Sequence, residues 1–242
     1  MYKFKPQEAR DKIVEGLERL AEEQGVSKVV IPIYPDKNSA VGAALCARAV
    51  GRENIYAVIV GKPIELAVHT KFQRNICFAL ALTNSYLDVG EICKRVSRDS
   101  VSFSDNSVQN IIYDETFMDE IALVGCKLIA ANLGALVAGT RSLCDYTVGN
   151  FIDSIGPDFN LFSEMTDPEI YQVGLCLKEL PKELLGKNNE SYKDVSYETV
   201  HHYIRQDAQL DLETWKKIRE LESKNYRKRM SAPPLYDPLL KE

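Results

Sequence analysis

Short apolar runs alternate with amphipathic stretches along residues 7–150, a pattern typical of strands and helices taking turns. An amphipathic helix is predicted over 7–24, and Gly25 follows it in the C′ position that ends many helices. Strands are expected over 28–34, 54–60, 77–82 and 135–139, and helices over 39–50, 64–75, 88–98 and 114–132. This alternation predicts an α/β fold: a doubly wound, mainly parallel sheet with helices on both faces.

The last third of the chain has a different pattern. Residues 167–179, 196–206 and 211–230 have helical periodicity, and no strand is predicted after 139. Asp211 is expected to cap the last helix, whose predicted buried face consists of Leu212, Trp215, Ile218 and Leu221. The polar, serine-rich stretch 99–110 is predicted to be a loop. We therefore expect a single domain over 1–242, in which an α/β core (7–150) carries a C-terminal helical part (151–242).

The composition of the chain excludes some classes of binding partner. The chain has 242 residues and a net charge of -5, so nucleic acid and anionic membrane surfaces are not expected as partners. No apolar run approaches the roughly 20 residues of a membrane span, and the first residues lack an apolar signal core. Six cysteines are irregularly spaced without a CxxC pair, which favours reduced thiols and a cytoplasmic location over disulfides or a zinc site.

The junction between the first predicted strand and its helix carries the most informative chemistry, in the turn Tyr34-Pro35-Asp36-Lys37-Asn38-Ser39. In open α/β sheets, phosphates bind at such a junction on the helix N-terminus. This turn contains no glycine, and its proline lacks an N–H group. Lys37 and Ser39 could still hold an anion there; alternatively, Asn38 or Ser39 only caps the helix.

Four segments, in order, resemble the ammonia-dependent NAD synthetases, which have an adenine-nucleotide α-hydrolase-like fold. They are 29–50 with the strand 53–60; 128–140, ending in Gly139-Thr140; 167–173 with 180–185; and 196–200 leading to 226–229 and Pro233-Pro234. The resemblance implies a homodimer that makes NAD from deamido-NAD, ATP and ammonia through an adenylated carboxylate, with ATP and magnesium as cofactors. On this basis Lys37, Ser39, Thr140 and Asp167 are candidate nucleotide-binding residues, and Asp145 is a candidate metal ligand in place of the family's glutamate.

The same comparison exposes departures from the family pattern. The SGGxDS loop, whose glycines let backbone N–H groups reach the pyrophosphate of ATP, falls on residues 34–39, and only Ser39 is kept. A carboxylate at Asp36 would repel the phosphates. The segment 118–122 lacks the expected arginine, and the loop between 185 and 196 is shortened.

Two functional hypotheses follow. The first is a divergent member that has lost ATP-dependent NAD synthesis and retains an altered nucleotide pocket or a scaffold role. The alternative is a working ATP-dependent amide-forming ligase with rebuilt phosphate contacts. A third possibility is that side chains fill the pocket, and Tyr34 is large enough to enter it.

Other candidate groups are weaker. Cys144 could be a nucleophile, but it needs a histidine base, and His69, His201 and His202 are the only histidines. His201 and His202 are adjacent on a predicted helix, so they are expected to be a surface pair and not a metal site. Lys224, Arg227, Lys228 and Arg229 could bind phosphate, or form a solvated helix end.

Overall fold

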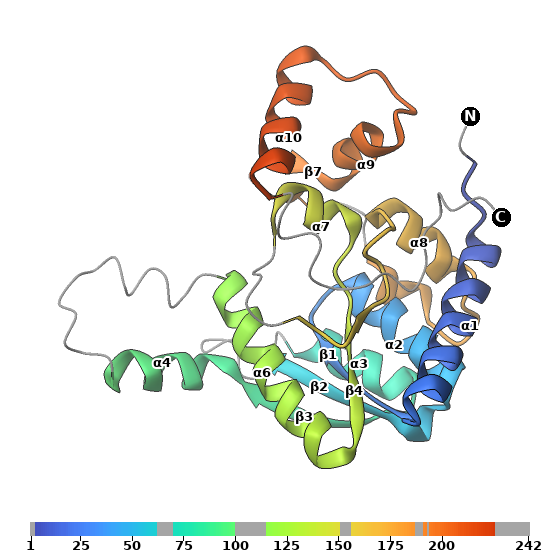
Figure 1. Ribbon diagram of the computed structural model, residues 1–242, viewed down its shortest axis with the longest axis vertical. Helices are drawn as coiled ribbons and strands as arrows, with labels where there is room; N and C mark the ends of the chain where they lie inside the picture. Colours follow the sequence, from blue (N-terminus) through green and yellow to red (C-terminus); the bar gives the residue numbers. More distant parts are fainter. Residues whose placement is uncertain are drawn as a thin grey trace.

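The computed structural model describes residues 3–61, 70–99, 115–150, 156–186, 191–192 and 194–225. A five-stranded sheet with the order β3-β2-β1-β4-β5 lies at its centre, and every neighbouring pair of strands is parallel (Figure 1). Its strands are β1 (Lys28–Ile33), β2 (Ile55–Gly61), β3 (Thr83–Asp88), β4 (Ala135–Gly139) and β5 (Phe159–Asn160). The predicted parallel α/β sheet is confirmed.

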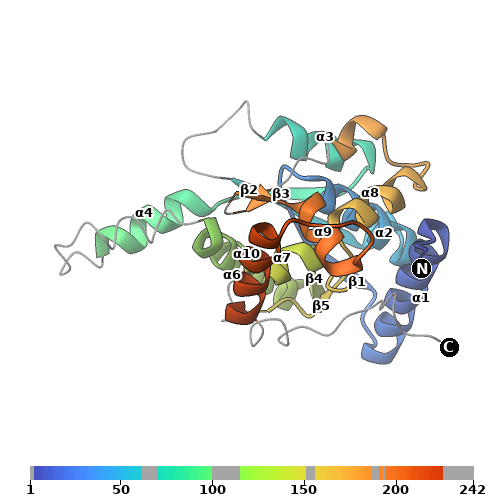
Figure 2. The same cartoon turned by 90° about the horizontal axis from the view of Figure 1, so that it is seen from above.

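Helices cover both faces of the sheet, as predicted (Figure 2). On one face, α2 (Lys37–Val50) and α3 (Lys71–Ala79) lie against the sheet, and α1 (Pro6–Gln24) and α8 (Asp167–Leu175) pack on α2. The other packs against α6 (Glu115–Leu133), which in turn contacts α4 (Val89–Asp99). Side chains of β1 alternate between the two faces of the sheet. Ile31 and Ile33 pack on the α2 side, and Val30 packs on the α6 side.

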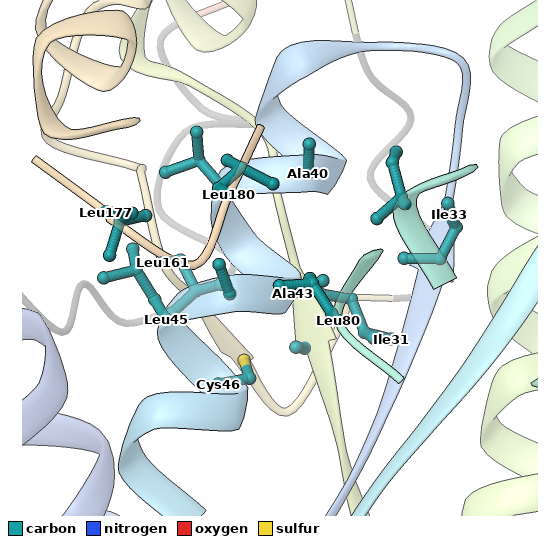
Figure 3. Close-up of a cluster of buried hydrophobic side chains, with 14 of the residues drawn as sticks. Ile31, Ile33, Ala40, Ala43, Leu45, Cys46, Leu80, Leu161, Leu177 and Leu180 are labelled. Atoms are coloured by element: carbon teal, nitrogen blue, oxygen red, sulfur yellow. The ribbon is translucent and has the colours of Figure 1, made fainter. Parts of the chain in front are cut away.

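The core between the sheet and α2 is made of small and branched side chains that interdigitate (Figure 3). Alanines on α2 let the helix lie close to Ile31 and Ile33, while leucines from beyond α8 close the outer side. The labelled members of this cluster that come from outside β1 are Ala40, Ala43, Leu45, Cys46, Leu80, Leu161, Leu177 and Leu180. The helix predicted over 39–50 therefore packs as a core helix.

A separate helical group lies beyond the carboxyl ends of the strands, at the top of Figure 1. It contains α7 (Leu143–Val148), α9 (Tyr197–Arg205) and α10 (Leu212–Asn225), which share a small buried cluster that includes Cys144, Val200 and Ile218. The remaining short elements are η1 (Arg52–Asn54), η2 (Lys182–Leu185), β6 (Ser191–Tyr192) and β7 (Val195–Ser196). No helix within the described residues is both long and apolar enough to cross a membrane.

Two strand predictions are wrong. The apolar run 77–82 is the end of α3 and a turn, and the strand follows at Thr83–Asp88. A six-residue apolar run fits a helix end as well as a strand, and β3 is an edge strand whose first residues are exposed and polar. The last third does contribute to the sheet, because β5 pairs with β4 at Ala138 and Gly139. Two residues are too few to leave a periodic pattern.

Most helix boundaries agree closely with the prediction, but α3 continues to Ala79, where the predicted helix 64–75 was expected to have ended. Gly25 has the left-handed conformation expected of a C′ glycine, with φ 63°, and Asp211 accepts hydrogen bonds from the N–H groups of Glu213 and Thr214 at the start of α10. Helix α8 ends at Leu175, earlier than predicted. The predicted segments 64–69, 100–110 and 226–230 lie outside the described residues.

Strands β1 and β4 separate toward their carboxyl ends. Their pairing extends from Lys28 to Val30 of β1, whereas β1 pairs with β2 as far as Ile33. Pro32 lies in the part of β1 that β4 no longer pairs, and proline has no N–H to donate to a ladder. Because the strand order reverses around β1, this edge is the topological switch point where ligands bind in open α/β sheets.

Candidate functional site

The N-terminus of α2 is capped by a carboxylate from its own turn. Asp36 is the N-cap residue, and its Oδ1 accepts a hydrogen bond from the Ser39 N–H at 2.7 Å. The Ser39 hydroxyl accepts one from the Tyr34 N–H at 3.0 Å. The predicted cap, Asn38 or Ser39, is therefore wrong by two or three positions, since the helix begins at Lys37. An anion binding here would meet a carboxylate already on the helix end.

Lys37 is buried and paired within the protein. Its Nζ lies 3.0 Å from Oδ1 of Asp167, the first residue of α8, and the two side chains are only 2% and 0% exposed. Asn38 donates to the same oxygen at 3.1 Å. The amide oxygen of Asn38, Oδ1, is buried without a hydrogen-bond partner. The N-termini of α2 and α8 thus meet through a carboxylate that the chain itself supplies.

Ser142 connects this pair to a second buried carboxylate. Its hydroxyl lies 2.5 Å from Asp167 Oδ2 and 3.1 Å from Asp145 Oδ2, and its N–H donates to Asp145 at 2.9 Å in the capping box of α7. Asp145 Oδ1 accepts from the Tyr197 hydroxyl at 2.6 Å and from Asn150 Nδ2 at 3.0 Å. Both oxygens of Asp145 are therefore occupied by protein donors.

Burial and charge shift the titration of these groups. Burial raises the pKa of Asp36, against the opposing effects of the Ser39 hydrogen bonds and Lys37. Burial and then the neighbouring Asp167 raise the pKa of Asp145, and Arg141 opposes this. Burial, followed by Asp145, also raises the pKa of the Tyr197 phenol. The site is thus a buried network in which protein carboxylates face protein cations.

The segment 118–122 lacks the arginine that the family resemblance led us to expect, but Arg141, from after β4, lies beside this segment. It pairs with Asp119 and donates to the Asn150 carbonyl at 2.6 Å. Burial lowers the pKa of Arg141, but the negative charges of Asp119 and Asp145 together raise it by more. The guanidinium therefore stays charged. An arginine from beyond β4 thus occupies the neighbourhood of a segment that contains none.

All the predicted site residues lie at this edge of the sheet. Thr140 follows β4 and is 8% exposed, and a Cβ added to Gly42 of α2 would come within 2.8 Å of its Cγ2. Lys37, Ser39, Asp145 and Asp167 belong to the turn and the network described above. Their roles toward a nucleotide or metal stay predictions. Tyr34 packs with the cluster of Val60 and Val89 next to α4 and α6.

The residues do not fit a magnesium ion as they stand. Magnesium requires near-octahedral oxygen ligands with most positions left to water and phosphate. Asp145, the candidate ligand, is 7% exposed and already accepts from Ser142, Asn150 and Tyr197. A metal would have to displace at least one of these donors.

Of the other candidate groups, Cys144 lies beside Asp167 of this network, whereas His201, His202 and Lys224 have other partners. Cys144 is buried, and burial and then Asp167 raise the pKa of its thiol, which lowers the thiolate fraction. His201 and His202 have Thr166 and Asp207 as partners, and His69 lies outside the described residues. Lys224 pairs with Glu220 on an exposed helix face, while 227–229 also lie outside. All six cysteines are free.

Sequence reasoning missed three members of the network: Ser142, Asn150 and Tyr197. Ser142 had a local signal, because Ser-x-x-Asp is a capping pattern at a helix start. Asn150 and Tyr197 had none. Tyr197 lies 52 residues from its partner Asp145, so only the packing of α9 against α7 brings them together.

Comparisons with a family profile and with solved structures both point to NAD and NMN synthetases. Residues 9–232 match the sequence profile of the NAD synthase family. Among solved structures, the chain is similar to an NMN synthetase from Francisella tularensis, with TM-score 0.81 and 17% identity, covering 96% of this chain and 98% of that one. It is also similar to an NH3-dependent NAD synthetase from Campylobacter jejuni in complex with a nitrate ion (TM-score 0.77, 19% identity, 93% and 96% covered). An NAD+ synthetase from Burkholderia pseudomallei gives TM-score 0.76 at 14% identity, with 95% and 91% covered. No curated protein sequence matches.

Proposed function

Since the chain belongs to the NAD synthase family, we propose that it is a divergent member that no longer cleaves ATP and acts as a binding or scaffold protein. The observation that carries this proposal is the 2.7 Å hydrogen bond from the Ser39 N–H to the Asp36 carboxylate. That N–H is one of the few donors left at the N-terminus of α2 for a phosphate, and a fixed negative charge already uses it.

Electrostatics support the same conclusion. Each charge-assisted hydrogen bond to a phosphate contributes roughly 1.5–3 kcal/mol, and this turn has lost both glycines that would allow close backbone approach. Lys37, the nearest cation, is paired with Asp167. A pyrophosphate would have to compete with both Asp36 and Asp167 for the same donors.

The alternative is an active ATP-dependent ligase that forms an amide from a carboxylate and ammonia. One observation favours it: the candidate residues Lys37, Thr140, Asp145 and Asp167 lie together at the switch point of the sheet. The similar solved structures include an NMN synthetase and an NH3-dependent NAD synthetase. In that case ATP and magnesium would be its cofactors.

Calorimetry with ATP and magnesium separates the two. We expect no binding heat at millimolar ATP, and no pyrophosphate release when ammonia and deamido-NAD, or the carboxylate precursor of NMN, are added. Tight magnesium-dependent binding with pyrophosphate release would overturn the proposal and establish the ligase.

A variant tests the observation directly. Replacing Pro35 and Asp36 by glycine (P35G/D36G) should confer measurable affinity for inorganic pyrophosphate, because it removes the carboxylate and restores an N–H. Asp211→Gly is the matched control, since Asp211 caps the exposed start of α10 in the same manner. If P35G/D36G binds no better than D211G, Asp36 is not what excludes the anion.

We also propose a cytoplasmic homodimer. The six free cysteines are consistent with a reducing compartment. Light scattering coupled to size-exclusion chromatography would give the oligomeric state.

A further inference from the structure

Two histidines and an aspartate converge at the end of α9, away from the switch point. Helix α9 ends at Arg205, and Gln206 takes the left-handed conformation, with φ 53°. The chain therefore turns back on itself, and Asp207 comes to lie beside the last turn of the helix. Its Oδ2 is 3.2 Å from His201 Nε2, and its Oδ1 is 2.7 Å from His202 Nδ1.

This arrangement differs from the expected surface pair. Adjacent helical residues point about 100° apart, so His201 and His202 were expected to face different ways. Their rings are tilted by 66° with centroids 5.5 Å apart, and Asp207 bridges them. One ligand atom from each of the three side chains can be chosen so that all lie within 4.8 Å of one another.

We propose that His201, His202 and Asp207 bind a divalent transition-metal ion of the zinc type. Two imidazoles and one carboxylate are a donor set that suits Zn²⁺, Co²⁺, Ni²⁺ or Cu²⁺, whereas Mg²⁺ and Ca²⁺ prefer oxygen alone. A tetrahedral ion about 2.0–2.2 Å from each donor needs the donors roughly 3.3 Å apart. The side chains of His202 and Asp207 are 33% and 40% exposed, so they have room for the small rotations this requires.

An outer partner orients the most buried ligand. His201, whose side chain is 14% exposed, has its Nδ1 2.7 Å from the hydroxyl of Thr166, which leaves Nε2 facing Asp207. Metal-binding histidines commonly have their second nitrogen held in this way. A hydroxyl can donate or accept, so Thr166 can serve the tautomer that faces the Asp207 carboxylate and also the one that leaves Nε2 free for a metal.

The site would link two elements of the fold. Thr166 is the N-cap residue of α8, while the three ligands lie at the end of α9 and in the turn after it. A bound ion would fix that turn on α8, and its open side faces solvent through the exposed parts of His202 and Asp207. Metal binding by these three side chains does not require that the chain bind ATP.

The test is a titration of the full chain, freed of metal by a chelator, with Zn²⁺ by calorimetry and Co²⁺ by visible spectroscopy. We expect one equivalent of zinc to bind, and cobalt to give the intense d–d bands of a tetrahedral site without a sulfur-to-metal charge-transfer band. His202→Ala and Asp207→Asn should each weaken zinc binding by at least about 10-fold, the lower end of the effect of even an outer-shell partner. Both positions are partly exposed, so folding should persist, which circular dichroism would verify.

His69→Ala, which removes the third histidine of the chain, is the matched control and should bind zinc as the wild type does. The proposal is overturned if no zinc binds, if H202A and D207N bind as tightly as H69A, or if cobalt shows thiolate bands, which would assign the metal to a cysteine.

Discussion

Single side chains determine the chemistry at the carboxyl edge of this sheet. Asp36 caps α2, Asp167 holds Lys37, and Asp145 completes a capping box while accepting from Tyr197. Each of these carboxylates is satisfied by donors from the chain itself. Buried charges persist when they are paired and hydrogen-bonded, so this edge is a stable ionic network even without a ligand.

Asp36→Asn gives a pH-dependent test at this scale. Asn is as good an N-cap as Asp, so the helix cap should survive. Burial raises the pKa of Asp36 above 3.8, which means that the folded state holds its proton more tightly than the unfolded state. The contribution of Asp36 to stability is therefore largest below 3.8 and declines as pH rises through the folded pKa.

The free energy of unfolding from urea denaturation should consequently favour D36N over the wild type more at pH 7 than at pH 4. A difference that stays constant, or that grows on acidification, would mean that ionisation of Asp36 is not penalised by burial.

At the scale of elements, fewer apolar side chains of α10 are buried than its periodic sequence pattern predicts. Of the four apolar positions predicted to be buried, Ile218 is 0% exposed and Leu221 is partly buried, but Trp215 is 37% and Leu212 68% exposed. The helix packs on α7 and α9 along a narrow stripe centred on Ile218. Trp215 instead lies beside Tyr203 and under Arg219.

Ile218→Ala and Leu212→Ala form a matched pair on this helix. Removing the buried side chain should lower the free energy of unfolding by about 2–5 kcal/mol, through lost burial and the cavity left behind. The exposed leucine should change it by no more than about 0.5 kcal/mol. Equal effects in chemical denaturation would contradict the assigned packing of α10.

At the scale of the whole molecule, one buried ion pair joins the helical group to the sheet-covering helices. Arg205 of α9 contacts Glu169 of α8 through two nitrogens, at 2.8 and 2.7 Å, and the side chains are 2% and 0% exposed. Arg205 also donates to the Glu164 carbonyl at 3.0 Å. This pair ties α9 to the body of the protein.

Arg205→Met should destabilise the protein by about 3–5 kcal/mol, because it leaves the Glu169 carboxylate buried without a counter-charge. Arg48→Met is the control: Arg48 also binds a glutamate with two nitrogens, but at 36% exposure, and its loss should cost no more than about 1 kcal/mol. Hydrogen exchange should localise the extra opening in R205M to α9 and α10. If both variants lose the same stability in urea, burial does not set the strength of this pair.

The sequence predicted most helices and three of the five strands because their signals are local. Gly25 and Asp211 mark a helix end and a helix start through groups a few residues away. It failed at β3, a polar edge strand, and at β5, where two residues are held only by pairing with β4. The candidate residues Lys37, Ser39, Thr140, Asp145 and Asp167 do lie together at the carboxyl edge of the sheet, and their roles stay predictions; their hydrogen-bond partners could not be predicted from the sequence.

The sequence by itself therefore determined the layered α/β architecture, the family resemblance and the loss of both glycines in the turn after β1, since all three depend on the order and type of neighbouring residues. Only the tertiary structure decided which side chains meet at the site. Lys37 meets Asp167 across 130 positions of sequence, Tyr197 meets Asp145 across 52, and Asp207 bridges two histidines only because the chain reverses at Gln206. Such contacts depend on how elements pack, and no periodicity along the chain encodes them.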